Sequence, residues 1–250
     1  LPLQDGFDNA GLQIGLTEAE ATGALLCLDV TEAVLDEAIA LGHNLVISHH
    51  PLIFKGYKSI TGKDYVERCI LKAIKNDIVI YSAHTNLDNA YGGVNYKIAE
   101  KIGLKNLQVL EPKENSLQDD LMQAGAGIVG ELDEPETELE FLKRIKKTFE
   151  VGCVRHNRLT GREIQKVALC GGAGAFLLPQ AIRAGADVFI TGEIKYHDYF
   201  GHEGDILMAE IGHYESEQYT KEIFYSIIRD LFPNFALQSS KINTNPIKYL

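Results

Sequence analysis

Short apolar runs alternate with segments of helical spacing from Ala24 onward. ALLCLDV precedes TEAVLDEAIALG, and NLVISHH, DYVERCILKAIKN and DIVIYSA follow in order. Continuous apolar runs of this length are typical of parallel strands covered on both faces, and the longer segments between them are typical of amphipathic helices. The alternation therefore predicts an α/β fold built on a parallel or mixed sheet flanked by helices.

Helix-end signals support this interpretation. Asp64 followed by Glu67 resembles a capping box that opens a helix. Gly42 and Gly103 fall where left-handed C-caps would close two other helices.

The pattern breaks at the polar stretch from Pro112 to Gln123 and then restarts. We predict a domain junction there. The second block is expected to hold strands at AGAGIVGEL, VGCVRH, KVALC, DVFITG and DILMAEIG and helices at ETELEFLKRIKKTF and at about 175–184. A long amphipathic segment, 213–231, and a strand near FALQSS are expected to end the chain.

Charge and composition exclude several classes of protein. A net charge of −11 gives no overall positive field for nucleic acid or an anionic membrane surface. The apolar runs are far shorter than the roughly 18 residues that a membrane-spanning helix needs. Four cysteines without a C-x-x-C pair predict reduced thiols, so we expect a cytoplasmic protein. Because the sequence begins with Leu1 rather than Met, we expect an N-terminal stretch to be missing from it.

His49 and His50 end the apolar run NLVIS and are followed at once by Pro51. Consecutive residues of a strand face opposite sides, so both imidazoles can serve one site only if the backbone leaves the strand here. Pro51 favours such an exit because it has no N–H to continue the strand pairing. The alternative is a polar strand end with two surface histidines.

Asp88 lies in AHTNLDNAYGG, again just after an apolar run, and His84 precedes it by four residues. Ligand sites of α/β sheets gather at the carboxyl ends of the strands, so this loop is expected to meet the His49–His50 loop. The alternative is an Asx-type turn before the next helix.

His213 and Glu217 follow a third apolar run, ILMAEI, at an i, i+4 spacing that places both on one face of a helix. Taken alone, this pair is typical of a solvated helix face. Three histidine and carboxylate clusters, each just beyond a predicted strand, instead indicate a shared metal site with these ligands: His49, His50, Asp88, His213 and Glu217.

Three imidazoles and two carboxylates suit Zn²⁺ best, with Mn²⁺, Fe²⁺ or Co²⁺ as alternatives. Five ligands are too few to saturate two ions, so water would fill the open positions. With a ligand charge of about −2 against +4, the site would attract a small anionic substrate.

Two further segments remain open. CGGAGAFLLPQAI predicts a strand, a glycine-rich turn and a helix, and its glycines fit tight packing of helix on strand better than phosphate binding. In TGEIKYHDYF, Glu193, Lys195 and His197 could contact a ligand if the segment folds toward the metals.

Several motifs, in this order, resemble those of the NIF3-like family, also called GTP cyclohydrolase type 2 homologues. They run from end to end of the chain: DGFDNAGLQIG, SHHPLIFKGYKSI, AHTNLDNAYGGVN, GGAGAF, TGEIKYHDYF, GHYESE and NTNPIKYL. Phe7 stands where the family has a Trp, which puts no ligand in doubt.

The resemblance implies two α/β lobes with a dinuclear metal site between them, held by the five ligands named above, with Glu217 bridging and His84 close by. It implies a first lobe of residues 1–115 with 205–250 and a second of 116–204, without the extra domain that some members insert. It also implies a hexameric ring of dimers.

We weigh two functions, of which the resemblance favours the first. The first is a metal-dependent hydrolase of GTP or another nucleotide, with a metal-bound hydroxide as nucleophile and His84 as proton shuttle. The alternative is a non-catalytic metal-binding or scaffold protein that acts through partners.

Overall fold

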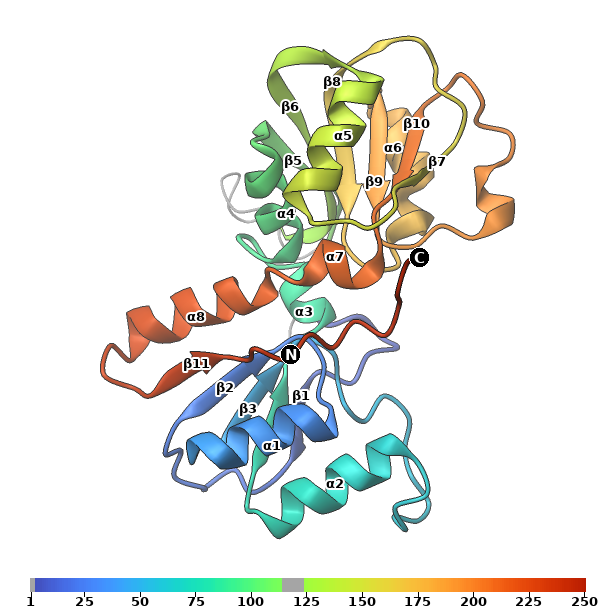
Figure 1. Ribbon diagram of the computed structural model, residues 1–250. Coiled ribbons are helices and arrows are strands. Elements are labelled where there is room, and N and C mark those ends of the chain that lie inside the picture. Colours follow the sequence, from blue (N-terminus) through green and yellow to red (C-terminus); the bar gives the residue numbers. More distant parts are fainter. Residues whose placement is uncertain (1–2, 114–123) are drawn as a thin grey trace. The chain divides into compact units, whose positions relative to one another are not determined.

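The computed structural model describes residues 3–113 and 124–250, which form two compact units. The first unit is Leu1–Leu87 with Thr220–Pro246, and the second is Asp88–Tyr219 with Ile247–Leu250. Each unit carries one mixed sheet flanked by helices, as the alternating sequence pattern predicts (Figure 1).

The unit boundaries lie away from the predicted lobe boundaries. Residues 88–113 belong to the second unit because β5 (Lys105–Pro112) pairs with β6 (Gly125–Thr137). Residues 205–219 belong there because β10 (Leu207–Glu210) pairs with β9 (Val188–Thr191). The junction predicted at Pro112 to Gln123 falls mostly on residues 114–123, which lie outside the described residues.

The sheet of the first unit has the strand order β1-β4-β3-β2-β11. All neighbours are parallel except β1, which runs antiparallel to β4. The carboxyl ends of β2, β3 and β4 therefore lie side by side at one edge. The strands are β1 (Gly11–Ile14), β2 (Ala24–Cys27), β3 (Leu45–Ser48), β4 (Val79–Ser82) and β11 (Leu237–Ser239).

Helices α1 (Glu32–Leu41) and α2 (Tyr65–Lys75) pack on this sheet through a hydrophobic core. The predicted C-cap of α1 is confirmed, since Gly42 is left-handed at φ 70°, and at the other end the Thr31 side chain accepts from the Val34 N–H. Core residues alternate along the strands and recur on one stripe of each helix: Leu25, Val46, Ile80, Val34, Leu35, Ala38, Cys69, Ile70 and Ala73.

The predicted capping box of α2 forms only in part. The Asp64 side chain accepts from the Glu67 N–H at 2.9 Å, as expected. The Glu67 carboxylate instead accepts from the N–H groups of Thr61 and Lys63, at 2.8 and 3.1 Å. Glu67 thus orders the loop that leads into α2.

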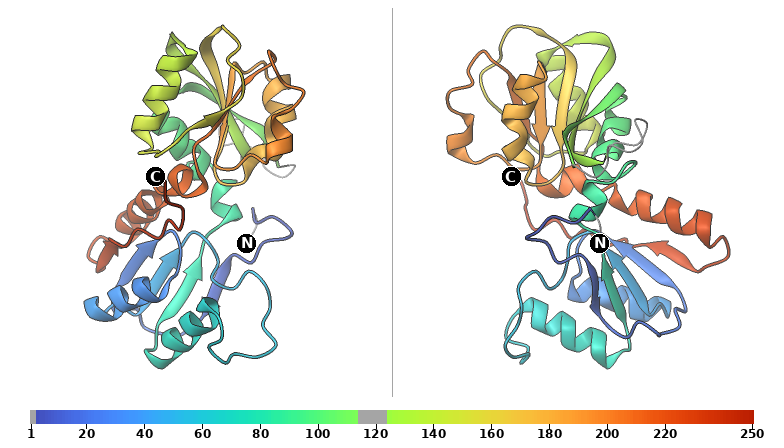
Figure 2. Two further views of the ribbon diagram at one scale, coloured as in Figure 1. Left: turned by 45° about the vertical axis from the view of Figure 1, so that its right-hand side comes forward. Right: turned by 180° about the vertical axis from the view of Figure 1, so that it is seen from behind.

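The sheet of the second unit has the strand order β5-β6-β8-β9-β10-β7. Strands β8 (Glu163–Cys170), β9 and β10 are parallel neighbours, whereas β7 (Arg155–His156) runs antiparallel to β10. Figure 2 shows α5 (Glu138–Thr148) on one face of this sheet and α6 (Leu178–Arg183) on the other. Helix α4 (Val94–Ile102) ends at Gly103, which is left-handed at φ 85°, as predicted.

Two predicted helices are divided in the structure. The segment expected at 175–184 is a 3-10 turn, η2 (Gly174–Leu177), followed by α6, because Pro179 lies in the first turn of α6. The segment expected at 213–231 is α7 (His213–Glu217) and α8 (Thr220–Leu231), interrupted at Gln218 and Tyr219. The boundary between the two units falls at this interruption.

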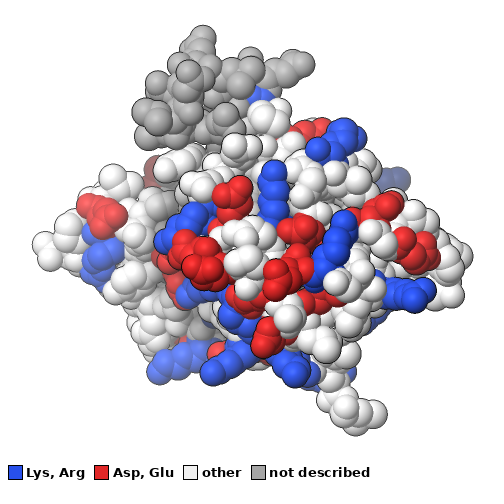
Figure 3. All heavy atoms as spheres, turned by 90° about the horizontal axis from the view of Figure 1, so that it is seen from above, with Lys and Arg blue, Asp and Glu red and all other residues white. Residues whose placement is uncertain are grey.

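In the part of the chain that the structure describes, no helix combines the length and the apolar character needed to cross a membrane. Lysine and arginine side chains are interspersed with aspartate and glutamate on the face drawn in Figure 3. That face therefore carries charges of both signs.

Candidate metal-binding clusters

His49 and His50 follow β3 at a point where the chain leaves the strand. The N–H groups of both residues donate to the Leu28 carbonyl, at 3.2 and 3.0 Å, and the Ser48 hydroxyl donates to the His50 carbonyl at 2.9 Å. The two ring centroids lie 4.8 Å apart. The backbone therefore leaves the strand at this point, as a shared site for both imidazoles requires, and the two rings lie on the same side of the chain.

His84 completes a cluster of three imidazoles in the first unit. Its ring centroid lies 5.3 Å from that of His49 and 5.5 Å from that of His50. One ring nitrogen from each residue lies within 4.8 Å of the other two. His84 follows β4, the neighbour of β3, so this cluster forms at the carboxyl ends of adjacent parallel strands. The three residues could together hold a metal ion.

Each imidazole of this cluster has its Nδ1 on an oxygen acceptor. His49 Nδ1 lies 2.9 Å from the Ala83 carbonyl, His50 Nδ1 lies 2.7 Å from Asp29 Oδ1, and His84 Nδ1 lies 2.7 Å from Asp8 Oδ1. A neutral ring that donates through Nδ1 carries its lone pair on Nε2. Metal-binding histidines are oriented in this way, with the second nitrogen held by a carboxylate or a carbonyl.

Asp29 and Asp8 are two residues that the sequence analysis did not single out. Asp29 lies two residues beyond the end of β2 at Cys27, so the rule that pointed to His49 also applies to it. Its second oxygen accepts from the Thr244 hydroxyl. Burial would raise the pKa of Asp8, but hydrogen bonds from Thr85 and His84 outweigh this effect and lower its pKa. Asp8 therefore remains a carboxylate opposite His84.

The second unit brings together Asp88, His213 and Glu217. His213 Nε2 lies 3.2 Å from Glu217 Oε2 across one turn of α7, and the Glu217 side chain is buried. A carboxylate oxygen of Asp88 lies within 4.8 Å of one of Glu217. His213 Nδ1 lies 2.9 Å from Glu193 Oε1. His213 thus has a carboxylate at each ring nitrogen, and a cation at Nε2 would be held by His213 and Glu217 together.

Glu193 is thus the member of the TGEIKYHDYF segment that reaches the cluster. His197 lies on the exposed 3-10 turn η3 (Tyr196–Tyr199), and Lys195 directly precedes this turn. They belong to none of the histidine and carboxylate clusters found among residues 3–113 and 124–250.

The glycine-rich turn after β8 makes room for the ligands on α7. A Cβ on Gly172, which has φ +59°, would lie 2.3 Å from Glu217 Oε1. Gly192, which follows β9, makes room for α7 in the same way, since a Cβ there would lie 2.9 Å from the Cα of His213. The N–H of Gly172 donates to the Ser216 hydroxyl at 3.0 Å, which fixes the turn against α7. The glycines are explained by close packing, the interpretation that the sequence favoured over phosphate binding.

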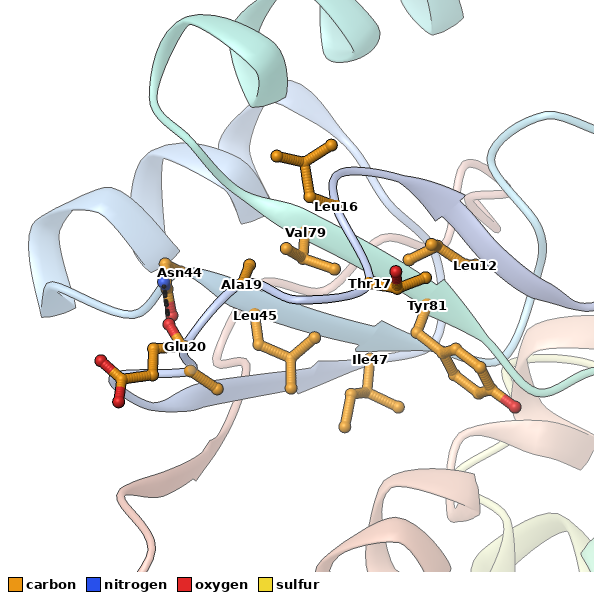
Figure 4. A pocket seen from close by; sticks show the side chains of 11 residues that line it. Leu12, Leu16, Thr17, Ala19, Glu20, Asn44, Leu45, Ile47, Val79 and Tyr81 are labelled. Atoms are coloured by element: carbon orange, nitrogen blue, oxygen red, sulfur yellow. Dashed lines mark hydrogen bonds between the residues drawn. The ribbon is translucent and has the colours of Figure 1, made fainter.

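A cavity of about 370 Å³ in the first unit has a different character (Figure 4). Its wall consists mainly of apolar side chains from β1, β3 and β4, on the sheet face opposite to Val46 and Ile80. Among the residues that the structure describes, Glu20 is the only carboxylate in this wall and no histidine lines it. The metal-ligating chemistry therefore lies elsewhere, in the two clusters.

A family model described as Duf34/NIF3 (NGG1p interacting factor 3) matches residues 1–246 of the chain. A Clostridium perfringens protein named GTP cyclohydrolase 1 type 2 homolog is 38% identical over 218 residues, which cover 86% of this chain and 80% of that protein. A Lactococcus lactis protein of the same name is 34% identical over 96% of this chain and 90% of its own length.

Solved structures give the same result. A Staphylococcus aureus hypothetical protein superposes with a TM-score of 0.91 at 33% identity, over 100% of this chain and 94% of that one. A Bacillus cereus protein related to NIF3 has a TM-score of 0.88 at 27% identity, over 100% of this chain and 95% of that one.

Proposed function

This chain belongs to the Duf34/NIF3 family, and from that premise we propose that it is a metal-dependent hydrolase of a nucleotide-like substrate. Its ligands for two divalent ions would be His49, His50, Asp88, His213 and Glu217. One observation carries the proposal: all four clustered histidines, these three and His84, have Nδ1 held by a carbonyl or carboxylate oxygen. Histidines on a solvated surface have no reason to share this arrangement.

The donor set suits zinc first, since neutral imidazoles and carboxylates without a thiolate match its preferences, as they also match those of Mn²⁺, Fe²⁺ and Co²⁺. Two carboxylates would leave two divalent ions with a net positive charge. The site would therefore attract an anionic substrate.

Bound ions of this kind lower the pKa of a coordinated water and polarise the group under attack. His84 is suited to move the proton. Its Nδ1 lies 2.7 Å from Asp8 Oδ1, so Nε2 can accept a proton while the Asp8 carboxylate stabilises the imidazolium. The name carried by the Clostridium and Lactococcus relatives makes GTP the first substrate to test, with purine ring opening and formate release.

The test combines elemental analysis of the purified protein with measurement of formate release from GTP. We expect bound divalent metal and turnover in the wild type, and loss of both in Glu217→Gln. Glu163→Gln, a change at an exposed carboxylate at the start of β8, is the matched control and should leave both unchanged.

A second candidate is a non-catalytic metal-binding protein that acts through partners, which the family description as an interacting factor favours. Metal without turnover on any nucleotide would reject the hydrolase and support this candidate. Less than one ion per chain after purification without chelator, unchanged by His50→Ala, would reject the metal site itself. We also propose the hexameric ring of dimers, which light scattering would test as six times the chain mass.

A further inference from the structure

The second unit holds a cavity of about 560 Å³ whose wall combines aromatic and cationic side chains. One side is the segment 154–158, which contains β7, and the other is formed by Tyr196, Tyr199, Phe200 and Glu203. β7 is the edge strand beside β10 in Figure 1. No metal-ligand candidate named above lines this cavity.

Two exposed aromatic rings form one wall. Tyr196 is 68% exposed and Phe200 is 56% exposed, with ring centroids 5.3 Å apart and planes at 69°. Aromatic side chains of this size bury well against one another in a core. Here they leave ring surface accessible beside a cavity, where a planar group can stack.

Two arginines face this wall in a chain of net charge −11. Arg155 Nη1 donates to Glu210 Oε1 at 2.8 Å, and its guanidinium lies 5.7 Å from the centre of the Tyr199 ring. Arg158 is exposed and has no ion pair with any residue that the structure describes. Glu203 is the one acidic residue in the lining within the described part of the chain, and it accepts from the Gly201 N–H. Because Arg155 is already paired with Glu210, Arg158 is the guanidinium of the lining that can pair with an anionic group.

Glu210 connects this cavity to the second unit's ligand cluster. Its Oε2 accepts from the Ile194 N–H at 3.2 Å and from the Tyr199 hydroxyl at 3.1 Å. Burial, followed by the charge of Glu210, raises the pKa of Tyr199, so the hydroxyl stays a donor. The residue before Ile194 is Glu193, which holds His213 Nδ1. A single turn, 193–200, thus orients a predicted ligand at one end and forms the cavity wall at the other.

We propose that this cavity binds a nucleotide, with its base stacked on the face of the Tyr196 ring beside Phe200, whose ring lies nearly edge-on to it, and its phosphate paired with Arg158. This inference rests on the proposed function, for which it names the subsite that recognises the substrate. Stacking on an aromatic ring recognises any base through its π-face, and a guanidinium forms strong paired hydrogen bonds to phosphate. A ligand with both features, a planar ring and an anionic group, fits the two walls together.

The test measures equilibrium binding of GTP and of guanosine to metal-depleted protein in EDTA by calorimetry. Arg158→Gln should weaken GTP binding at least fivefold and leave guanosine binding unchanged, because guanosine has no phosphate. Tyr196→Leu should weaken both ligands at least fivefold. Arg183→Gln, at an exposed arginine of α6, and Tyr225→Leu, at an exposed tyrosine beside Arg229 on α8, should stay within twofold of wild type.

The proposal is overturned if folded, metal-free protein shows no saturable GTP binding, or if the two cavity variants bind GTP as the controls do. Circular dichroism verifies the fold of each variant. The experiment separates this inference from the hydrolase, because the cavity variants should keep wild-type metal content. Normal cavity binding without formate release would reject the hydrolase alone, whereas formate release with unaffected cavity variants would reject the subsite alone.

Discussion

The histidines of the first unit differ in what holds them. His49 is fully buried and its Nδ1 meets a backbone carbonyl, whereas His50 and His84 each meet a carboxylate. A carboxylate partner makes the opposite ring nitrogen more basic and thus a stronger ligand than a carbonyl partner does. The residues that orient the imidazoles should therefore contribute measurably to metal affinity.

Asp29→Asn tests this contribution. The amide keeps an acceptor for His50 Nδ1 but loses the negative charge, so we expect metal affinity to fall about 10–100-fold. Zinc titration of metal-depleted protein against a competing chelator measures the change. Asp36→Asn is the control, because Asp36 forms an ion pair with Lys72 on the surface. Equal affinities for the two variants would mean that Asp29 does not support a ligand.

The structure brings several of the residues that the sequence singled out close together, and their role as metal ligands stays a prediction. His49, His50 and His84 meet in the first unit, and Asp88, His213 and Glu217 meet in the second. The rule that found them was position just after an apolar strand. Asp29 obeys the same rule but was missed because its partner, His50, follows a different strand, and strand order cannot be read from a single sequence.

At the scale of secondary-structure elements, the glycine-rich turn after β8 determines how much space the Glu217 side chain has. Gly172→Ala would place a methyl group 2.3 Å from Glu217 Oε1, the mobile end of that side chain. We expect the carboxylate to move away, so that metal affinity falls more than tenfold. An alanine held in the left-handed conformation also lowers the free energy of unfolding by about 1–2 kcal/mol, so the control must be another left-handed glycine.

Gly185→Ala provides the matched control. Gly185 has φ +69° in the same unit, and no atom of residues 3–113 and 124–250 lies within 4 Å of its added Cβ. Chemical denaturation should show similar losses of stability for the two variants, while metal titration should show a loss for Gly172→Ala alone. If both variants bind metal like the wild type, the turn does not position Glu217.

The start of α2 gives a prediction about pH. The hydrogen bond from the Thr61 N–H is the largest effect on the pKa of Glu67. Burial would raise this pKa, but that bond and further hydrogen bonds from Thr61 and Lys63 together lower it to about 2. A carboxyl group whose pKa is lower in the folded state stabilises the fold above its unfolded pKa, and this contribution is lost as pH falls toward the folded value. Glu67→Gln should therefore be less stable than wild type at pH 7, and the difference should shrink between about pH 5 and pH 2.

Urea denaturation at a series of pH values measures this effect. Glu163→Gln, at an exposed carboxylate of β8, should show no such convergence. A difference between Glu67→Gln and wild type that stays constant from pH 7 to pH 3 would contradict the assigned role.

The element predictions succeeded where local chemistry decides the structure. Gly42 and Gly103 end α1 and α4 as expected, because cap residues act on the neighbouring backbone. The predicted helix over 213–231 was wrong as a single helix. Its apolar period continues through Gln218 and Tyr219, whose side chains instead donate to the carbonyls of Phe149 and Thr148. Such a tertiary interaction leaves no local signal.

For the whole molecule, each unit gathers polar side chains at the carboxyl ends of its parallel strands. β2, β3 and β4 lead to Asp29, His49 and His84, and β9 and β10 lead to Glu193 and His213. The sequence predicted two α/β bodies but could not place their boundaries, because pairing of β5 with β6 and of β10 with β9 is a long-range choice.

Metal binding should stabilise the whole protein, because a ligand that binds only the folded state shifts the unfolding equilibrium. At free zinc of 100 times the dissociation constant, one site adds about 2.7 kcal/mol. For a chain of this size that corresponds to a rise in Tm of about 5–10 °C, which differential scanning calorimetry of metal-depleted protein with and without zinc would measure. His49→Ala removes a buried predicted ligand, so its Tm should respond less to zinc at the same concentration. An equal rise for His49→Ala and wild type would show that the stabilising zinc binds elsewhere, and no rise in wild type would contradict a metal site formed by the folded chain.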